Sequence, residues 1–188
     1  MKQVLGFAIT GSFCTLETAL GLVEKLREKY RVIPILSENA ATTDTRFMKA
    51  DSLRRRLTAL CGTPPLTGLC EVEPLGPGKV LDLLMVCPCT GNTLSKLAHG
   101  ITDTTVTMAV KSHRRNGGKV LLALSTNDAL SGSAKSIGVL LDKKGYFFVP
   151  LRQDDAEGKP HSLQSLWDTV PDAVEAALEG KALSPLLR

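Results

Sequence analysis

The sequence predicts an α/β fold in which a parallel sheet carries helices on both faces. Short apolar runs that suit buried strands alternate along the chain with longer segments whose apolar residues recur at helical spacing. The clearest unit is residues 82–108. There an apolar run ends at Pro88, a small polar turn follows, and apolar residues recur at helical spacing from Leu94 to Gly100.

The first unit is an apolar strand over residues 4–9 and an amphipathic helix over residues 16–30. The turn between them, residues 10–14, lacks the GxGxxG pattern of a dinucleotide site. Gly11 and Ser12 in this turn suit a mononucleotide phosphate, which backbone N–H groups and the Ser12 hydroxyl would hold. Gly-Ser turns are common, however, and an ordinary structural turn is the simpler explanation of the same two residues.

The second unit begins with an apolar strand over residues 32–36 that ends at the small hydroxyl of Ser37. A polar stretch follows, and then a helix over residues 46–60 whose arginine triplet belongs on a solvated face. Residues 61–79 are rich in proline and glycine, which predicts a loop with at most one short strand at residues 69–72.

The central strand, residues 83–86, is apolar throughout, as expected of a parallel strand buried on both faces. It ends at Pro88, and the turn over residues 89–93 leads into the helix that ends at Gly100. Another helix over residues 103–116 ends at a glycine pair.

The same reasoning predicts a strand at residues 120–124, a helix at 134–144 and a last strand at 146–149. Residues 151–161 are polar and predict a mobile loop. The C-terminal helical segment, residues 162–180, predicts a closing helix at residues 163–178 that Pro171 interrupts. With about 150 residues expected per domain, residues 1–188 are expected to form a single domain.

The amino-acid composition and net charge limit the classes of protein to which the chain can belong. The chain is 43% hydrophobic and 22% charged, and it has neither a signal-peptide pattern nor an apolar run near the ~20 residues that span a bilayer. We therefore expect a cytoplasmic protein. A net charge of +4 with only 4% aromatic residues does not indicate a nucleic-acid module.

The five cysteines lack CxxC spacing, so we expect free thiols and no metal site. Cys89 lies near a predicted helix N-terminus, which would lower the pKa of its thiol. A catalytic cysteine therefore stays open beside the simpler interpretation, a small residue that fills space.

Four predicted turns end in small hydroxyl or amide side chains. These are Ser12, Ser37, residues 90–93 and residues 125–127. All four follow strands, and the carboxyl ends of parallel strands meet at one edge of a sheet, where α/β proteins bind ligands. The sequence therefore predicts a ligand site whose side chains orient a ligand more than they transfer protons.

Residues 88–93, PCTGNT, resemble the PASANT motif of the homo-oligomeric flavin-containing cysteine decarboxylases, and LSKLAHGITD after it is similar to that family's next helix. The resemblance implies a three-layer, Rossmann-like or flavodoxin-like fold in trimers or their multiples, with a flavin mononucleotide (FMN) pocket at a subunit interface. It implies cofactor-binding roles for Gly11, Ser12, Ser37, Thr90, Asn92, Thr93 and Thr107. Asn92 and Asn127 would be the catalytic residues, at the reactive side of the flavin and in the substrate-recognition turn.

The catalytic histidine of those decarboxylases has no counterpart, because the chain has no His before His99. GFAITGSFCTLE, STNDALSGSAKSIGVLL and the QDD segment instead resemble the branch formed by dipicolinate synthase B subunits. This branch implies oxidation of a dihydrodipicolinate-level precursor to pyridine-2,6-dicarboxylate in the mother cell of a spore-forming bacterium. The partner A subunit would carry NAD(P), and Arg114, Arg115 and Arg152 would bind substrate carboxylates.

Two functions stay open beside this one. The chain is an FMN-binding flavoprotein of the decarboxylase or flavin prenyltransferase type, or it is a non-catalytic subunit that binds ligand for its dehydrogenase partner. The retained Gly11-Ser12 and Asn92-Thr93 pairs favour a flavin site, and the missing histidine favours the non-catalytic role. No membrane or nucleic-acid partner is expected.

Overall fold

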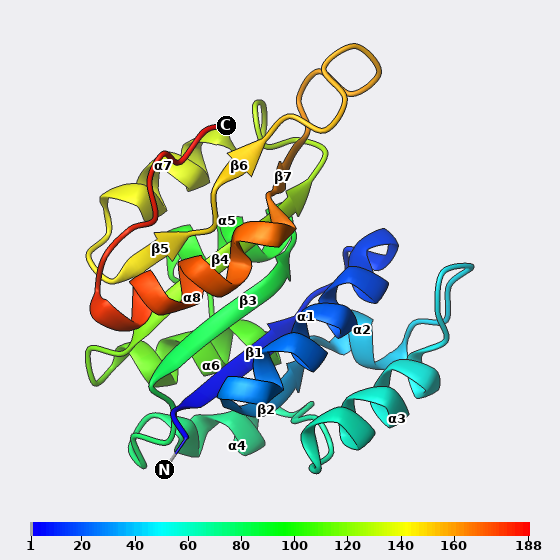
Figure 1. The fold of residues 1–188 in the computed structure, drawn as a ribbon, viewed down its shortest axis with the longest axis vertical. Helices are drawn as coiled ribbons and strands as arrows, with labels where there is room; N and C mark the ends of the chain where they lie inside the picture. The colour runs from blue at the N-terminus through cyan, green and yellow to red at the C-terminus, as the bar shows by residue number, and fades with distance from the viewer. Residues whose placement is uncertain (1) are drawn as a thin grey trace.

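Five parallel strands form the larger part of a seven-stranded sheet in the computed structural model, which describes residues 2–188 (Figure 1). They are β1 (Val4–Ile9), β2 (Arg31–Leu36), β3 (Leu83–Cys89), β4 (Lys119–Thr126) and β5 (Tyr146–Phe148). The pairing gives the order β2-β1-β3-β4-β5, the doubly wound order of flavodoxin-like folds. The direction of winding reverses between β1 and β3, and this is where such folds bind ligands.

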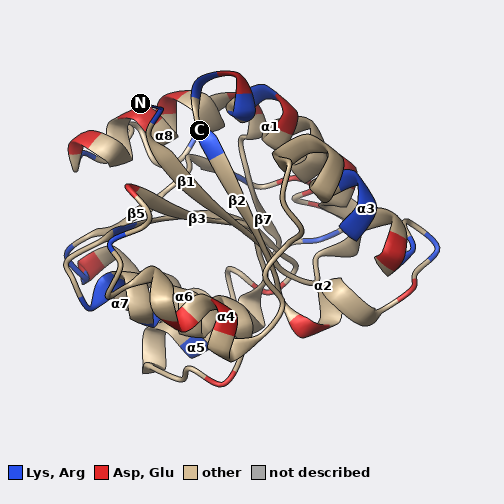
Figure 2. Ribbon diagram, turned by 90° about the horizontal axis from the view of Figure 1, so that it is seen from below, with Lys and Arg blue, Asp and Glu red and all other residues tan. Residues whose placement is uncertain are grey.

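Helices cover both faces of this sheet, as expected (Figure 2). One layer holds α1 (Leu16–Lys29), α3 (Ala50–Cys61) and α8 (Val170–Glu179). The other holds α4 (Leu69–Val72), α5 (Gly91–His99), α6 (Thr105–Arg114) and α7 (Ala134–Asp142). Among the described residues, no helix is both long and apolar enough to span a bilayer.

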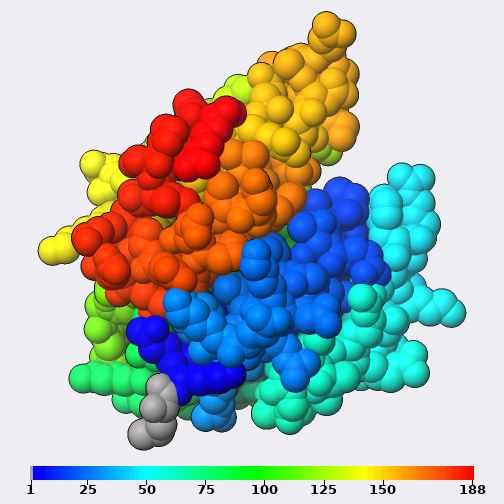
Figure 3. All heavy atoms as spheres, in the orientation of Figure 1, coloured from blue at the N-terminus to red at the C-terminus, as the bar shows by residue number. Residues whose placement is uncertain are grey.

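The strands bury alternate side chains in two cores. In β3, Leu83 and Met85 belong to the core beneath α1, α3 and α8, whereas Leu84 and Val86 belong to the core beneath α4 to α7. All four side chains are fully buried, as the apolar run predicted. Figure 3 shows α1 and α8 lying side by side across the outer surface of the first layer.

The C-terminal region differs from the prediction of a closing helix from residue 163. Residues Leu163–Ser165 form β7, which pairs antiparallel with the end of β4 and with β6 (Leu151–Arg152). The helix α8 begins only at Val170, with Pro171 in its first turn. Proline is favourable there because the first turn leaves N–H groups unpaired in any case, so Pro171 starts a helix and does not break one.

Three smaller predictions are also corrected. The predicted short strand at residues 69–72 is the helix α4, which a 3-10 turn, η2 (Glu73–Leu75), extends. The polar stretch after β2 contains a short helix, α2 (Glu38–Thr42), that the sequence pattern did not predict. Strand β3 continues through Pro88 to Cys89, and its pairing with β4 shifts register between Val86 and Cys89. Proline lacks the N–H that a regular ladder needs, which accounts for the interruption.

Candidate functional site

A hollow of about 350 Å³ lies at the carboxyl edge of the sheet, beside the point where the strand order reverses. Its wall comes from the turn after β1, the end of β3, the end of β4 with the turn that follows, and the segment that leads into β7. The lining residues are Gly11, Ser12, Cys14, Thr90, Ser125, Thr126, Asn127, Asp128, Asp154, Lys159, Ser162, Leu163 and Gln164.

Hydroxyl groups tie three neighbouring strand ends together at this hollow. The Oγ atoms of Ser12 and Ser125 are 2.8 Å apart, a hydrogen bond that joins the turn after β1 to the end of β4. The buried Thr10 Oγ1 donates to the Pro88 carbonyl at 2.7 Å and accepts from the Thr90 N–H at 3.0 Å. The edge of the sheet is therefore held in place before any ligand arrives.

Thr90 begins α5 as its N-cap. Its Oγ1 accepts a hydrogen bond from the Thr93 N–H at 3.3 Å, as a threonine at this position is expected to do. Thr93 is buried beneath the first turn, whereas Asn92 points to the exposed side of α5. The structure therefore places Thr90 in the hollow and leaves Asn92 and Thr93 outside its lining.

Asp128 connects the turn after β4 to the start of α7. Its Oδ1 accepts hydrogen bonds from Thr126 Oγ1 and from Ser133 Oγ, the second at 3.0 Å. These groups lie against Gly91, where an added Cβ would come within 2.5 Å of Ser133 Oγ. The contact packs the turn after β4 against the first residue of α5.

The charged groups of the hollow are two carboxylates and one ammonium. Asp154 has a pKa below its ordinary range, because Ser162 donates a hydrogen bond to its carboxylate and Lys159 lies nearby. The Lys159 Nζ is 3.5 Å from Asp154 Oδ2. Among the described lining residues no side chain is a histidine, so this wall contains no imidazole for proton transfer.

Four predicted site residues line the hollow together: Gly11, Ser12, Thr90 and Asn127. Ser37 lies outside the lining, where its Oγ caps α2 by accepting from the Ala40 N–H. Thr107 is also outside. It is fully buried and forms a reciprocal cap with Thr104 at the start of α6.

The three predicted carboxylate-binding arginines do not reach the hollow. Arg114 donates to the backbone carbonyls of Gly118 and Lys144, both at 2.6 Å, so it fastens the end of α6 to the loop before β5. Arg115 is exposed beside it, at the end of the sheet where β4 and β5 begin. Arg152 is exposed on β6 and is not part of the lining.

The thiol interpretation of Cys89 is not supported. Cys89 and Cys87 are fully buried, and burial raises the pKa of each thiol far above its ordinary value. Their side chains pack in the two cores. No group of three or more His, Cys, Asp or Glu side chains in the described part of the chain is placed to hold a metal ion.

Lys159, Ser162 and Gln164 were not predicted as site residues, and they enter the lining through the antiparallel pairing of β7 with β4. Nothing in their local sequence indicates a site. The short segment Leu163–Ser165 carries too little pattern to be distinguished from the start of a helix.

Comparison with known proteins shows the family to which this chain belongs. The chain belongs to the flavoprotein family, whose family model matches residues 1–175. Within that family it is a homologue of the B subunit of dipicolinate synthase from Bacillus subtilis, with 38% identity over 184 residues that cover 97% of this chain and 92% of the relative.

Solved structures agree with this placement. The B subunit of dipicolinate synthase from Bacillus halodurans superposes with a TM-score of 0.90 at 35% identity, covering 100% of this chain and 98% of that one. The FMN-dependent cysteine decarboxylase SpaF superposes with a TM-score of 0.67 at 22% identity, covering 94% and 97% of the two chains. At that identity the second likeness extends to the fold alone.

Proposed function

We propose that this chain is the B component of a two-component dipicolinate synthase. It would take part in oxidising a dihydrodipicolinate-level precursor to pyridine-2,6-dicarboxylate, in the cytoplasm of a spore-forming cell. The A subunit would carry NAD(P), and this chain would form a homo-oligomer beside it. The proposal is carried by the hollow, in which Ser12, Ser125 and Thr90 converge from three strand ends. The chain that forms it is 38% identical to the B subunit of dipicolinate synthase from Bacillus subtilis.

The lining suits orientation of a substrate better than transfer of its protons. Hydroxyl and amide groups predominate, and they stay neutral at pH 7. Formation of an aromatic ring favours the oxidation, so the protein has to hold the precursor in a reactive position and balance the charge of its two carboxylates. A histidine base is not required for either task.

The same hollow fits FMN in several respects. Its volume is in the ~300–1,000 Å³ range of small-ligand sites. Gly11 and Ser12 lie in the turn that suits a phosphate, and Thr90 and Asn127 line the same hollow. Bound FMN would supply a group that accepts hydride. The exposed Asn92 would reach it only if a second copy of the chain completes the pocket, as the family resemblance implies. Ser37, Thr93 and Thr107 are buried within this chain.

A flavoprotein of the decarboxylase or flavin prenyltransferase type is the second candidate, favoured by membership of the flavoprotein family. The absence of histidine from the described lining counts against cysteine decarboxylation. A chain that only binds ligand for its partner is the third candidate, and the two-component assay described next separates it from the first.

The test combines a spectrum with an activity measurement. The purified chain is mixed with FMN, free flavin is removed, and the visible absorption is recorded. It is then combined with the A subunit, and dipicolinate formation is measured. We expect a retained flavin band and product formation that Asn92→Ala abolishes without a large loss in melting temperature. A colourless protein whose Asn92→Ala variant is fully active would leave ligand binding for the partner as the function.

A further inference from the structure

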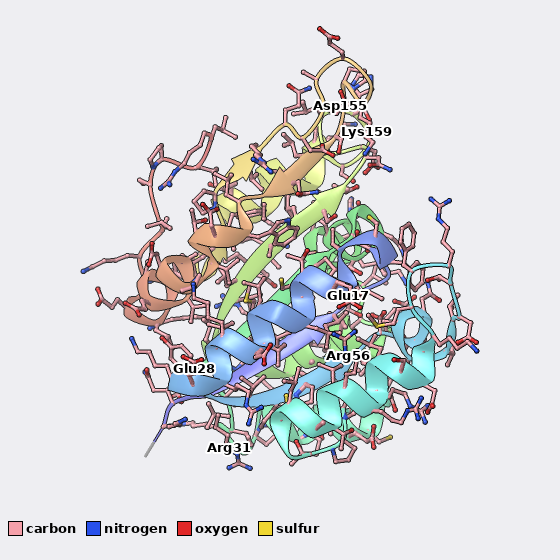
Figure 4. All side chains as sticks on the ribbon, turned by 45° about the vertical axis from the view of Figure 1, so that its right-hand side comes forward. Glu17, Glu28, Arg31, Arg56, Asp155 and Lys159 are labelled. Atoms are coloured by element: carbon pink, nitrogen blue, oxygen red, sulfur yellow. The ribbon has the colours of Figure 1, made fainter. Side chains whose placement is uncertain are left out.

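The segment between β6 and β7, residues 153–162, brings charged side chains to the hollow; we call it the site loop. Three of the described lining residues are charged, namely Asp128, Asp154 and Lys159, and the last two belong to the site loop. The loop projects beyond the end of the sheet, and Figure 4 labels Asp155 and Lys159 on it. The positive charge at the hollow therefore comes from a segment that the sequence predicted only as a mobile loop.

Hydrogen bonds hold the backbone on both sides of Lys159. The Lys159 N–H donates to the Asp155 carbonyl at 2.8 Å, and the Ser162 N–H donates to the Lys159 carbonyl at 3.0 Å. The His161 carbonyl accepts from the Leu130 N–H at 2.9 Å, which fastens the site loop to the turn after β4. Lys159 is thus carried by a folded turn that is anchored to the rest of the site.

Gly158 takes part in closing this turn. The Gly158 N–H donates to Asp155 Oδ1 at 2.8 Å, so the Asp155 side chain binds the backbone of the turn. The sequence thus supports the turn that presents Lys159.

The carboxylates of Asp128 and Asp154 already accept hydrogen bonds, whereas the Lys159 ammonium has N–H groups without a close acceptor among the described residues at the hollow. Asp128 accepts from Thr126 and Ser133, and Asp154 accepts from Ser162. The 3.5 Å between Lys159 Nζ and Asp154 Oδ2 is an ion pair, but it is longer than a strong hydrogen bond. An ammonium has three N–H groups, and the Lys159 side chain is 54% exposed at the hollow.

We propose that Lys159 binds one carboxylate of the dianionic substrate in this hollow. The inference rests on the proposed function and deepens it. It assigns the role of binding a substrate carboxylate to Lys159, which lines the hollow, in place of Arg114, Arg115 and Arg152, which do not. The substrate carboxylate would take Lys159 N–H groups that Asp154 leaves free. Lys159 would also counter the repulsion that Asp128 and Asp154 exert on an incoming anion.

The experiment measures Lys159→Ala, Lys159→Arg and the control Lys144→Ala. Lys144 is also exposed but lies at the opposite end of the sheet, before β5. Each chain is titrated with pyridine-2,6-dicarboxylate and, separately, with FMN. Each is also combined with the A subunit, and KM and kcat are determined for dipicolinate formation.

We expect Lys159→Ala to weaken dicarboxylate binding and to raise KM by about tenfold to hundredfold, the usual effect of losing a charge-assisted hydrogen bond. Lys159→Arg restores most of the affinity, and Lys144→Ala matches the wild type. FMN affinity stays within about twofold in every variant, which excludes the flavin phosphate as the anion at Lys159.

Three results would overturn the inference. If the wild-type complex forms dipicolinate and Lys159→Ala has an unchanged KM and dicarboxylate affinity, this inference fails and the proposed function stands. If the wild-type complex neither forms nor binds dipicolinate, both fail together. The substrate assignment is also contradicted if Lys159→Ala loses affinity for FMN but keeps its affinity for the dicarboxylate. Lys159 would then bind the flavin phosphate.

Discussion

The absence of a side chain at Gly91 allows the turn after β4 to pack against the start of α5. A Cβ there would lie 2.5 Å from Ser133 Oγ, 2.6 Å from Asp128 Oδ1 and 2.8 Å from Thr126 Oγ1. These are the three partners of the hydrogen-bond cluster beside the hollow. Gly91 is the first residue of a helix and has no positive φ, so close packing and not backbone conformation requires glycine here.

We therefore expect Gly91→Ala to destabilise the protein by about 1–3 kcal/mol, the typical cost of overpacking. Gly138→Ala is the matched control, because Gly138 is also helical and has nothing within 4 Å of an added Cβ. It should gain about 0.5–1 kcal/mol through the better helix propensity of alanine. Urea denaturation of both variants measures the difference, and equal stability would contradict the packing argument.

At the level of single residues, the sequence predicted the part of the hollow that follows β1, β3 and β4. Ser12, Thr90 and Asn127 were predictable because small polar residues directly after apolar strands lie at one edge of a sheet. Ser37 and Thr107 are small hydroxyl residues of the same kind, yet their hydroxyls cap helices. A capping residue and a ligand-binding residue have the same side chains, so the sequence does not separate the two roles.

At the level of elements, the short helix α2 has a larger role than its length suggests. Its first residue, Glu38, accepts from the Thr105 N–H at 2.9 Å and from Thr105 Oγ1 at 3.0 Å. Thr105 is the first residue of α6 and is fully buried. A carboxylate from α2 thus satisfies the unpaired N-terminus of α6, where negative charge is favourable.

We expect Glu38→Ala to lower the free energy of unfolding by about 1–2 kcal/mol, because it removes the charged acceptor of the buried Thr105 N–H. The Thr105 hydroxyl keeps the Thr67 carbonyl as an acceptor. Glu28→Ala on α1 is the control, an exposed glutamate whose loss should change stability by less than about 0.5 kcal/mol. Thermal or urea unfolding of the two variants checks this. Indistinguishable curves would mean that water replaces the Glu38 carboxylate without cost.

Elements of the long, periodic kind were predicted well, whereas two of the short elements were assigned to the wrong class. The helices α1, α3, α6 and α7 were recognised because each has several turns of apolar spacing. The four-residue α4 and three-residue β7 were misassigned, since their state is decided by tertiary contacts with α6 and β4 and not by local pattern. The missed residues Lys159 and Ser162 depend on β7, so one misassigned element concealed part of the site.

At the level of the whole molecule, the three-layer architecture was predictable from alternation alone. Apolar strands that alternate with amphipathic helices permit few other arrangements, because crossover connections are short and right-handed. The antiparallel β6 and β7 were not foreseen, since one has two residues and the other three. The strand order comes only from the structure, because pairing between strands is a long-range property.

The stability of the whole chain should depend on pH through one buried imidazole. His113 is 4% exposed, and its Nε2 donates to the Lys119 carbonyl at 3.0 Å. Burial lowers the pKa of His113 below its ordinary 6.5, so the folded chain keeps the ring neutral while the unfolded chain takes up a proton. Stability is therefore complete above pH 6.5 and is lost as the pH falls from 6.5 towards the folded pKa.

Within that window we expect a slope of up to about 1.4 kcal/mol per pH unit, measured by urea denaturation between about pH 8 and pH 5. The His113→Gln variant should be less stable than the wild type at the alkaline end, but its free energy of unfolding should change little with pH across the window. The control His161→Gln, on the exposed site loop, should keep the wild-type slope. Paired carboxylates such as Asp154 have lowered pKa values, so their contribution is lost only at more acidic pH. A wild-type stability that does not change across the window would show that His113 becomes protonated without opening the fold.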